Sequence, residues 1–491
     1  MEKNLDELIK ERERKYQEIL SSGVYPHGKK FERSSSIFGI IEKFSKIEAG
    51  EKLDSEKVKI AGRIRSIREH GKLIFYDIED FTARIQVVFD VKFLGEKNFK
   101  FLEKFNVGDF IGIEGFIGKT KIGELSVWAE RYELLNKALR PLPHEWYGLK
   151  DVEVRYRERY LDLIMNPKVR EIFIKRALII KAMREFLENN GYIEVNTPVL
   201  QPIYGGALAK PFTTYHNELK RTLYLRISPE LYLKRAIVGG FEKVYEITVN
   251  FRNEGIDTKH NPEFTMLETM WAYANYEDNM KFCEEMIEYI AKRVLQKTKI
   301  TYQEKEINLK APFKRITMYD AIKEYLNINV EKESDANLRK FLIEKNLKVP
   351  SYASRGYLIS EIFNLVEGKI EQPTFITDFP VEVSPLAKTK AENPQLTERF
   401  ELIILGQEYA NSYSEENNPK EQRRKLQEQA KLRKKGSEEA HMMDEDFIKA
   451  LEYGMPPTSG LGIGVDRLVM LLTDSASIRE VIMFPILKEE K

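Results

Sequence analysis

The chain has 491 residues, which is too long for one domain and suggests about two to four. Its hydrophobic content of 42% and charged content of 32% are typical of a soluble globular protein. The formal net charge of +1 excludes a strong global attraction to nucleic acid, so any such partner must meet local basic patches. A single cysteine, Cys283, excludes an intrachain disulfide. We expect a cytoplasmic protein with no membrane partner, because the sequence has neither a signal peptide nor an apolar run of membrane-spanning length.

Residues 1–50 predict an N-terminal helical extension. Residues 1–30 combine mixed charges with sparse apolar positions at helical spacing. This pattern is typical of a solvated helix packed on a larger body, although a basic surface helix near RNA would show the same pattern.

Residues 51–140 predict a small β-barrel of the OB type. Five short alternating segments lie between Lys57 and Leu135, with glycine-containing turns and a helix expected between the third and the fourth. Such barrels often present aromatic side chains that stack on nucleobases. Pro141 and Pro143 then stiffen the chain, so we place a linker at residues 141–153.

Residues 154–491 predict one large α+β domain. A strong helix over 173–189 ends at Asn190-Gly191 and precedes a short strand that stops at Pro198. A helical insertion is expected at about 319–368. A second helical stretch, at 418–447, carries basic residues interleaved with glutamates, which is typical of a solvated helix face.

The segment 250–268 carries residue types that suit a nucleoside triphosphate. Arg252 offers a permanently charged fork that can bind a phosphate and a carboxylate at once. Phe264 can stack on a purine, Glu254 can accept the adenine amino group, and His260 can meet the terminal phosphates. An isolated arginine or histidine is more often structural, but the strings NFRNEG and HNPEF around them favour the nucleotide site.

Glycines at every second position mark a second segment, Gly460, Gly462 and Gly464. This spacing is not that of a dinucleotide-binding loop and instead suits a strand over which a ligand lies closely. Arg467 then opens an apolar helix and could stack on the other face of the adenine. Taken alone, the segment would equally fit a buried strand–helix pair with a structural arginine.

Glu401 and Glu408 flank an apolar run, so at least part of that segment is expected to be buried. Isolated carboxylates at this spacing are usually surface groups. Buried carboxylates need a partner, and Mg²⁺ that bridges ATP phosphates would supply one.

Together, segments 250–268 and 460–467 resemble motifs 2 and 3 of class II aminoacyl-tRNA synthetases. Strings at 205–212, 226–235 and 239–247 resemble the lysine–tRNA ligases of that class, and the resemblance covers nearly the whole chain. It implies an N-terminal OB anticodon-binding domain and a class II catalytic domain built on an antiparallel sheet flanked by helices. It also implies a homodimer whose interface includes the helix before Pro198.

The resemblance implies that ATP and L-lysine react to give lysyl-adenylate and pyrophosphate, and that lysine then passes to the 3′ end of tRNA(Lys). Catalysis would rest on positioning and on charge neutralisation by Arg252, Arg467 and Mg²⁺. The ATP-binding residues would be Arg252, Glu254, His260, Asn261, Phe264, Glu401 and Arg467, with Glu401 and Glu408 on Mg²⁺. The lysine-binding residues would be Gly206, Glu230, Glu268, Asn411, Tyr413, Glu415 and Gly462, since glutamates suit two ammonium groups. Anticodon bases would meet Arg68, Phe75, Gln86 and Glu124.

Three positions depart from the family pattern. Met270 stands where a tyrosine usually helps to hold the lysine ammonium, and methionine is a poor hydrogen-bonding group. Lys210 and Lys259 stand where arginine is usual, so the charge is kept and the bidentate fork is lost.

Three other functions compete. A ligase for aspartate or asparagine would need cations around the substrate side chain, whereas this chain gathers glutamates. A paralogue that lysylates a protein such as elongation factor P would lack the barrel. A non-enzymatic RNA-binding module would be favoured by loss of Arg252 or Arg467, and both are present.

Overall fold

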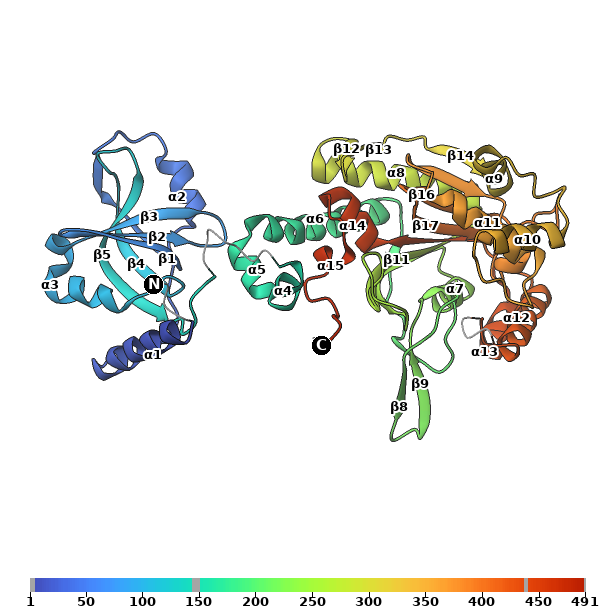
Figure 1. Ribbon diagram of the computed structural model, residues 1–491, viewed down its shortest axis with the longest axis horizontal. Coiled ribbons are helices and arrows are strands. Elements are labelled where there is room, and N and C mark those ends of the chain that lie inside the picture. Colours follow the sequence, from blue (N-terminus) through green and yellow to red (C-terminus); the bar gives the residue numbers. More distant parts are fainter. Residues whose placement is uncertain (1–4, 144–150, 437–439, 490–491) are drawn as a thin grey trace. The chain divides into compact units, whose positions relative to one another are not determined.

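The computed structural model describes residues 5–143, 151–436 and 440–489. The chain divides into two compact units, Met1–Lys150 and Asp151–Lys491, which we describe separately (Figure 1). Part of the predicted linker, residues 144–150, lies outside the described residues. The finer domain boundaries therefore stay predictions.

The N-terminal unit is a closed five-stranded barrel with the strand order β1-β2-β3-β5-β4. Its strands are β1 (Lys52–His70), β2 (Leu73–Glu79), β3 (Arg84–Asp90), β4 (Phe110–Lys119) and β5 (Leu125–Asn136). Its helices are α1 (Leu5–Ser21), α2 (Ile37–Phe44), α3 (Val91–Phe101) and the short η1 (Leu102–Lys104). The predicted OB-type barrel is confirmed, including the helix between the third and fourth strands. Alternate residues of β2, among them Ile74, Tyr76 and Ile78, fill its core.

The C-terminal unit is built on an eight-stranded sheet with the order β14-β15-β16-β17-β18-β11-β10-β6. Its neighbours are antiparallel except the β14–β15 and β10–β6 pairs. The strands of this sheet are β6 (Ile193–Glu194), β10 (Lys243–Phe251), β11 (Glu263–Ala272), β14 (Lys314–Thr317), β15 (Thr374–Thr377), β16 (Arg399–Ile404), β17 (Gln407–Ser414) and β18 (Thr458–Gly464). Two small sheets contain β7 (Leu200–Gln201), β8 (Thr213–His216), β9 (Arg221–Leu225), β12 (Lys299–Tyr302) and β13 (Lys305–Asn308).

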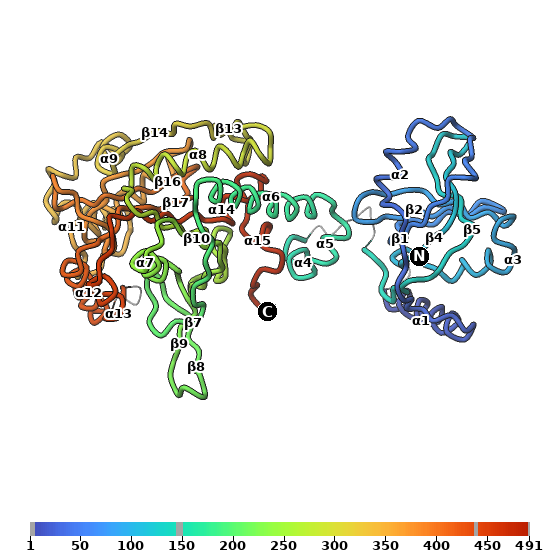
Figure 2. Tube along the Cα trace, turned by 180° about the vertical axis from the view of Figure 1, so that it is seen from behind, coloured from blue at the N-terminus to red at the C-terminus, as the bar shows by residue number. Residues whose placement is uncertain are grey.

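Helices complete this unit, and the predicted mixture of helices and an antiparallel sheet is confirmed. They are α4 (Val152–Arg157), α5 (Arg159–Met165), α6 (Pro167–Asn189), α7 (Glu230–Val238), α8 (Tyr276–Leu295), α9 (Met318–Leu326), α10 (Asp335–Glu344), α11 (Arg355–Glu367), η2 (Val381–Val383), α12 (Pro419–Lys434), α13 (Glu445–Glu452), α14 (Val465–Thr473) and α15 (Ile478–Val481). Helices α6, α8 and α14 lie on the same side of the large sheet, and the β8–β9 hairpin projects from the unit (Figures 1 and 2).

Local chemistry explains the ends of these elements. Helix α6 begins at Pro167, earlier than predicted, because a proline at the first helical position has no N–H to leave unpaired. Helix α8 begins with a capping box between Asn275 and Asp278. The buried face of α8, which includes Cys283, packs into the main core. Burial also raises the pKa of the Cys283 thiol, as expected for a core residue. No described helix is both long and apolar enough to cross a bilayer.

Candidate active site

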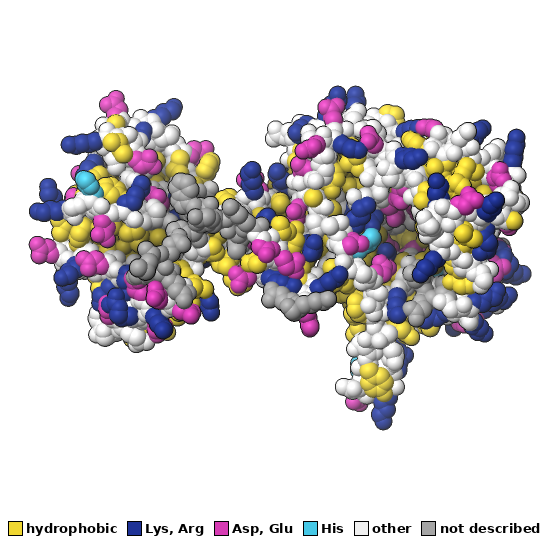
Figure 3. All heavy atoms as spheres, in the orientation of Figure 1, with side chains coloured by type: hydrophobic (Ala, Val, Ile, Leu, Met, Phe, Trp, Pro, Cys, Tyr) yellow, Lys and Arg dark blue, Asp and Glu magenta, His cyan; other side chains and the backbone are white. Residues whose placement is uncertain are grey.

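A cavity of about 380 Å³ opens over the large sheet of the C-terminal unit. In Figure 3 this unit shows a hollow edged by acidic and basic side chains. Every residue that the sequence predicted for ATP, lysine or Mg²⁺ lines the cavity, and its role there stays a prediction. These residues are Gly206, Glu230, Arg252, Glu254, His260, Asn261, Phe264, Glu268, Glu401, Glu408, Asn411, Tyr413, Glu415, Gly462 and Arg467.

The strand register explains how residues far apart in the sequence meet. One row crosses four strands through Glu401, Asn411, Gly462 and Glu268, each opposite the next. The neighbouring row crosses the same strands through Arg399, Tyr413, Gly460 and Met270. Side chains two positions apart on a strand share one face, so both rows belong to the floor of the cavity.

Glycines keep this floor clear. Along β18, Leu461 and Ile463 are buried in the core, while Gly460 and Gly462 face the cavity. A Cβ at Gly460 would overlap the carboxylate of Glu415 and lie 2.9 Å from Met270 Cε. The alternating glycines thus leave room between charged walls, as expected for a strand under a ligand.

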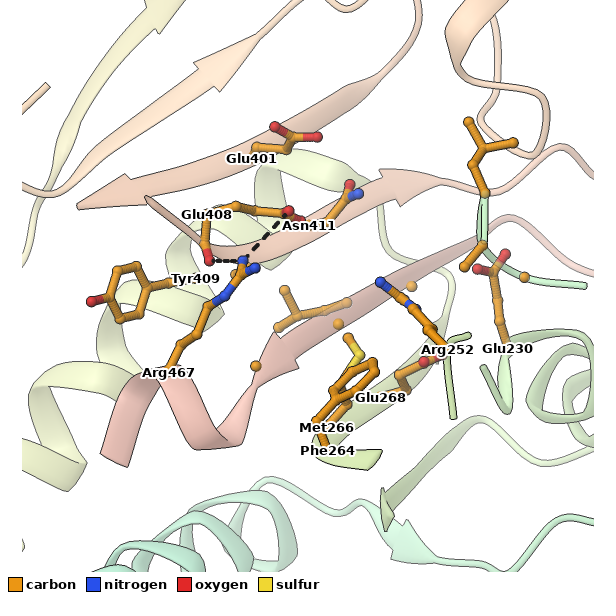
Figure 4. Close-up of a pocket in the computed structure, with 18 of the residues that line it drawn as sticks. Glu230, Arg252, Phe264, Met266, Glu268, Glu401, Glu408, Tyr409, Asn411 and Arg467 are labelled. Atoms are coloured by element: carbon orange, nitrogen blue, oxygen red, sulfur yellow. Dashed lines mark hydrogen bonds and ion pairs between the residues drawn. The ribbon is translucent and has the colours of Figure 1, made fainter. Parts of the chain in front are cut away.

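Two arginines enter the cavity from different elements (Figure 4). Arg252 follows β10, is half-buried, and lies with its guanidinium carbon 5.0 Å from the ring centroid of Phe264. Burial lowers its pKa, and the nearby charge of Glu254 opposes that shift. Arg467 opens α14, and its Nη1 donates to the carbonyl oxygen of Glu408 at 2.6 Å. Two guanidinium groups in one cavity suit a polyanionic ligand.

The loop between β10 and β11 is ordered by its own hydrogen bonds. The exposed His260 lies with Nδ1 3.0 Å from Asp257 Oδ2, and Asp257 also accepts the backbone N–H groups of Lys259 and His260. The Asn261 amide donates to the Glu263 carbonyl oxygen at 2.6 Å, and its buried Oδ1 has no hydrogen-bond partner among the described residues. Glu254 is exposed.

Two carboxylates on paired strands form a candidate cation site. Burial raises the pKa of Glu401 to about 8, and the negative charges of Glu408 and Glu367 add to that shift. The guanidinium of Arg399 opposes the shift, with its Nη2 2.5 Å from Glu401 Oε1. A divalent cation would relieve this repulsion, so the donors fit Mg²⁺. The described residues contain no group of three or more His, Cys, Asp or Glu side chains that could hold a metal ion, so water or phosphate oxygens would have to complete the coordination.

The other end of the cavity is acidic. Ser228 Oγ donates to the carboxylate of Glu268, at 2.9 Å from both oxygens, and accepts the backbone N–H of Glu230 at 3.0 Å. Burial raises the pKa of Glu268 to about 8, and the charge of Glu230 adds to that shift. Glu230 and Glu415 both contact the ammonium of Lys234. Three carboxylates thus face one small space.

Comparison with known proteins places this geometry in a family. Residues 151–488 match the family model of class II tRNA synthetases (D, K and N), and residues 58–135 match that of the OB-fold nucleic acid binding domain. A lysine–tRNA ligase from Carboxydothermus hydrogenoformans is 53% identical over 487 residues, covering 99% of this chain and 98% of the relative. A lysine–tRNA ligase from Thermotoga maritima is 50% identical over 488 residues, which cover 99% of this chain and 97% of that relative.

The chain belongs to the class II tRNA synthetases. Its cavity has Glu230 and Glu268 at one end with Arg252 beside them, and Glu401, Glu408 and Arg467 toward the other end (Figure 4). The predicted family resemblance is confirmed.

Sequence reasoning missed several residues of the synthetase site. Ser228 and Lys234 lie within the string that carried the resemblance, yet neither was assigned a role. Arg399, which holds both Glu401 and Asn411, precedes the predicted carboxylate by two positions. His441 lines the cavity from a loop, and burial lowers its pKa to about 4, so it is neutral. Among these residues, only Lys234 could have been predicted from the sequence, because side chains four residues apart on a helix meet and the spacing of Glu230 and Lys234 therefore indicates an ion pair.

The departures from the family pattern have different surroundings in the synthetase. Met270 is 2% exposed and packs with Leu231, Ile237 and Val244. Strand β17, two strands away from Met270, supplies a hydroxyl in the same row, because Tyr413 lies one strand beyond Gly460 and hydrogen-bonds to Glu230. Lys210 and Lys259 are exposed.

Three of the predicted anticodon residues, Arg68, Phe75 and Gln86, share the outer face of the barrel. Arg68 lies opposite Phe75, and its Nη2 contacts Asp77 Oδ1 at 3.0 Å. Gln86 lies opposite Asp77, is 8% exposed, and accepts the Ser126 hydroxyl at 3.0 Å. Glu124 is exposed in the turn before β5. Phe75 is half-buried against Phe116 and Trp128 on this face.

Proposed function

We propose that this synthetase activates L-lysine with ATP to form lysyl-adenylate and transfers lysine to the 3′ end of tRNA(Lys), releasing AMP and pyrophosphate. One observation carries the proposal: a single cavity gathers the carboxylates Glu230, Glu268 and Glu415 at one end, with Arg252 beside them and Arg467 toward the other end (Figure 4). An amino acid with two ammonium groups is the substrate that buried carboxylates complement. The relatives named lysine–tRNA ligase agree with it.

The chain's residues would act by positioning and charge. Arg252 lies beside Glu230 and Glu268 (Figure 4), where its fork would bind the lysine carboxylate and the α-phosphate together. Phe264 and Arg467 would enclose the adenine, while Glu254, His260 and Asn261 would hold the nucleotide. No protein nucleophile is needed, because the lysine carboxylate itself attacks the α-phosphorus as pyrophosphate leaves.

Glu401 and Glu408 would hold Mg²⁺. When bound, Mg²⁺ neutralises phosphate charge as the pyrophosphate leaves. Arg399 would keep Glu401 aimed into the cavity, since the two side chains meet at 2.5 Å.

We also propose a homodimer in the cytoplasm that reads the tRNA(Lys) anticodon through Arg68, Phe75, Gln86 and Glu124. Exposed apolar side chains support the dimer: Ile174 and Leu178 on α6 are 42% and 46% exposed, and Ile193 on the edge strand β6 is 53% exposed. A sheet edge flanked by apolar side chains suits pairing with a second chain.

The test is ATP–pyrophosphate exchange by the purified protein with each of the twenty amino acids, without tRNA. We expect exchange with lysine alone, followed by lysine transfer to tRNA(Lys) when it is added. Exchange with another amino acid would show that the Met270 surroundings have changed the specificity. No exchange with any amino acid would refute the proposal.

A further inference from the structure

A buried lysine lies directly behind the acidic end of the cavity. Lys234 on α7 is fully buried and is not among the residues that line the cavity. Its Nζ lies 2.6 Å from Glu230 Oε1 and 2.5 Å from Glu415 Oε2, so one ammonium joins two carboxylates from different elements. The ring centroids of Tyr413 and Phe447 lie 5.6 and 5.8 Å from the same nitrogen.

The surroundings keep this lysine charged. Burial alone would lower its pKa, but Glu230 and Glu415 together raise it above the ordinary value. Burial raises the pKa of Glu415, and Lys234 opposes that shift. His441, whose pKa the charge of Lys234 also lowers, is neutral because burial lowers its pKa to about 4. Two buried carboxylates without this cation would repel each other at high cost.

The charges of the acidic end then match one kind of substrate. Glu230, Glu268 and Glu415 carry three negative charges when ionised, and Lys234 cancels one of them. Two remain, which equals the number of ammonium groups on lysine, while Arg252 is left for the substrate carboxylate. This inference rests on the proposed function. We infer that Lys234 is a positioning residue that holds Glu230 and Glu415 at a fixed spacing. It also leaves the acidic end with a net charge of about −2, which matches a diamino acid.

The test is steady-state ATP–pyrophosphate exchange by the full-length chain and its variants, with the KM for lysine and for ATP measured separately. Lys234→Met keeps the length of the side chain and removes the charge. We expect the KM for lysine to rise by about tenfold or more with the KM for ATP nearly unchanged, because Glu230 and Glu415 without a cation between them would take up a proton or move apart, and both effects act at the amino-acid end. Lys234→Arg keeps the charge and should recover part of the loss.

A double-variant comparison separates charge balance from packing. In a Glu415→Gln background one negative charge is already absent, so adding Lys234→Met should raise the KM for lysine much less than it does in the wild type. The pH profile of kcat/KM for lysine should also move to higher pH in Lys234→Met, since uncompensated carboxylates bind protons more tightly. A purely structural lysine would produce neither effect.

Lys137→Met is the matched control. Lys137 is a buried lysine paired with the buried Asp109 at 3.0 Å, but it lies in the barrel. It should lower stability without changing the KM for lysine in exchange.

The inference is overturned if folded Lys234→Met keeps the wild-type KM for lysine, or if the KM values for lysine and ATP rise together. If Lys234→Met does not fold, the comparison of Glu415→Gln with the double variant decides: a similar KM supports the inference and a further large rise overturns it. If the wild-type chain shows no lysine-dependent exchange, the proposed function fails first, which is a separate outcome.

Discussion

The two ends of the cavity are prepared for their ligands in different ways. At the acidic end, each buried carboxylate already has a partner: Ser228 for Glu268, and Lys234 for Glu230 and Glu415. Hydrogen bonds alone do not separate the ends: Asn261 Oδ1, Arg252 Nε and both oxygens of Glu415 have no hydrogen-bond partner among the described residues, but Glu415 has the ion pair with Lys234.

Charge explains the difference, because all of these atoms are buried. A buried ionised carboxylate must be paired even without substrate, whereas a neutral amide oxygen or one N–H of a guanidinium costs less when it waits for the ligand. The acidic end is therefore preorganised for specificity, and the nucleotide end offers contacts that ATP would complete. Substitutions at the two ends should change different kinetic constants.

The largest expected effect is at Arg252. Arg252→Ala should lower the rate of ATP–pyrophosphate exchange by about a thousandfold or more, because it removes charge from the reacting phosphate and carboxylate. Arg252→Lys should recover little, since the bidentate fork is lost. The unfolding midpoint should stay close to that of the wild type. An exchange rate of Arg252→Ala within tenfold of the wild-type rate would show that the reaction does not depend on this arginine.

The acidic end should respond to pH. The pKa of Glu268 is raised to about 8, so the carboxyl is neutral below that pH and negative above it. A substrate ammonium binds the negative form, so the KM for lysine should fall by about tenfold or more between pH 6.5 and 8.5. Glu268→Gln should raise this KM and weaken its pH dependence, leaving the part that comes from Glu415, whose pKa is also raised to about 8. The same pH dependence in the variant would assign the titration to another group.

The floor between the two ends can be tested at Gly460. Gly460→Ala adds a Cβ that overlaps Glu415, so we expect a loss of about 1–3 kcal/mol in the free energy of unfolding and a higher KM for lysine. Gly368→Ala is the control, because a Cβ added there would meet only open space and the φ of Gly368 is −60°. Equal stability of the two variants in denaturant unfolding would contradict the crowding at Gly460.

The smallest effect is expected in the barrel, which takes no part in exchange. Phe75→Leu retains an apolar side chain against Phe116 and Trp128 but loses the aromatic face. It should lower kcat/KM for tRNA(Lys) by about tenfold and leave ATP–pyrophosphate exchange unchanged. Unchanged charging kinetics would remove Phe75 from the anticodon site.

The sequence predicted the types of element better than their arrangement. The alternation in Ile74, Tyr76 and Ile78 identified a barrel strand, because one face of such a strand is buried. The motif residues were found because charge and aromatic groups cluster within short strings. The linker at 141–153 lies partly outside the described residues and stays a prediction.

The parts that the sequence could not predict depend on register. Nothing local indicates that Met270, Gly460 and Tyr413 form one row, since strand pairing is a long-range property. Lys234 was missed for a related reason: a glutamate and a lysine four residues apart usually form a surface pair, and long-range packing with Glu415, Tyr413 and Phe447 is not visible in the local sequence.

The most direct measurement compares L-lysine with L-norleucine, which has the same carbon chain without the side-chain ammonium, in ATP–pyrophosphate exchange. If buried carboxylates select the substrate, kcat/KM for lysine should exceed that for norleucine by about ten-thousandfold, because norleucine would leave a buried carboxylate unpaired. Comparable values for the two amino acids, or a preference for aspartate, would contradict the assignment of the acidic end to lysine.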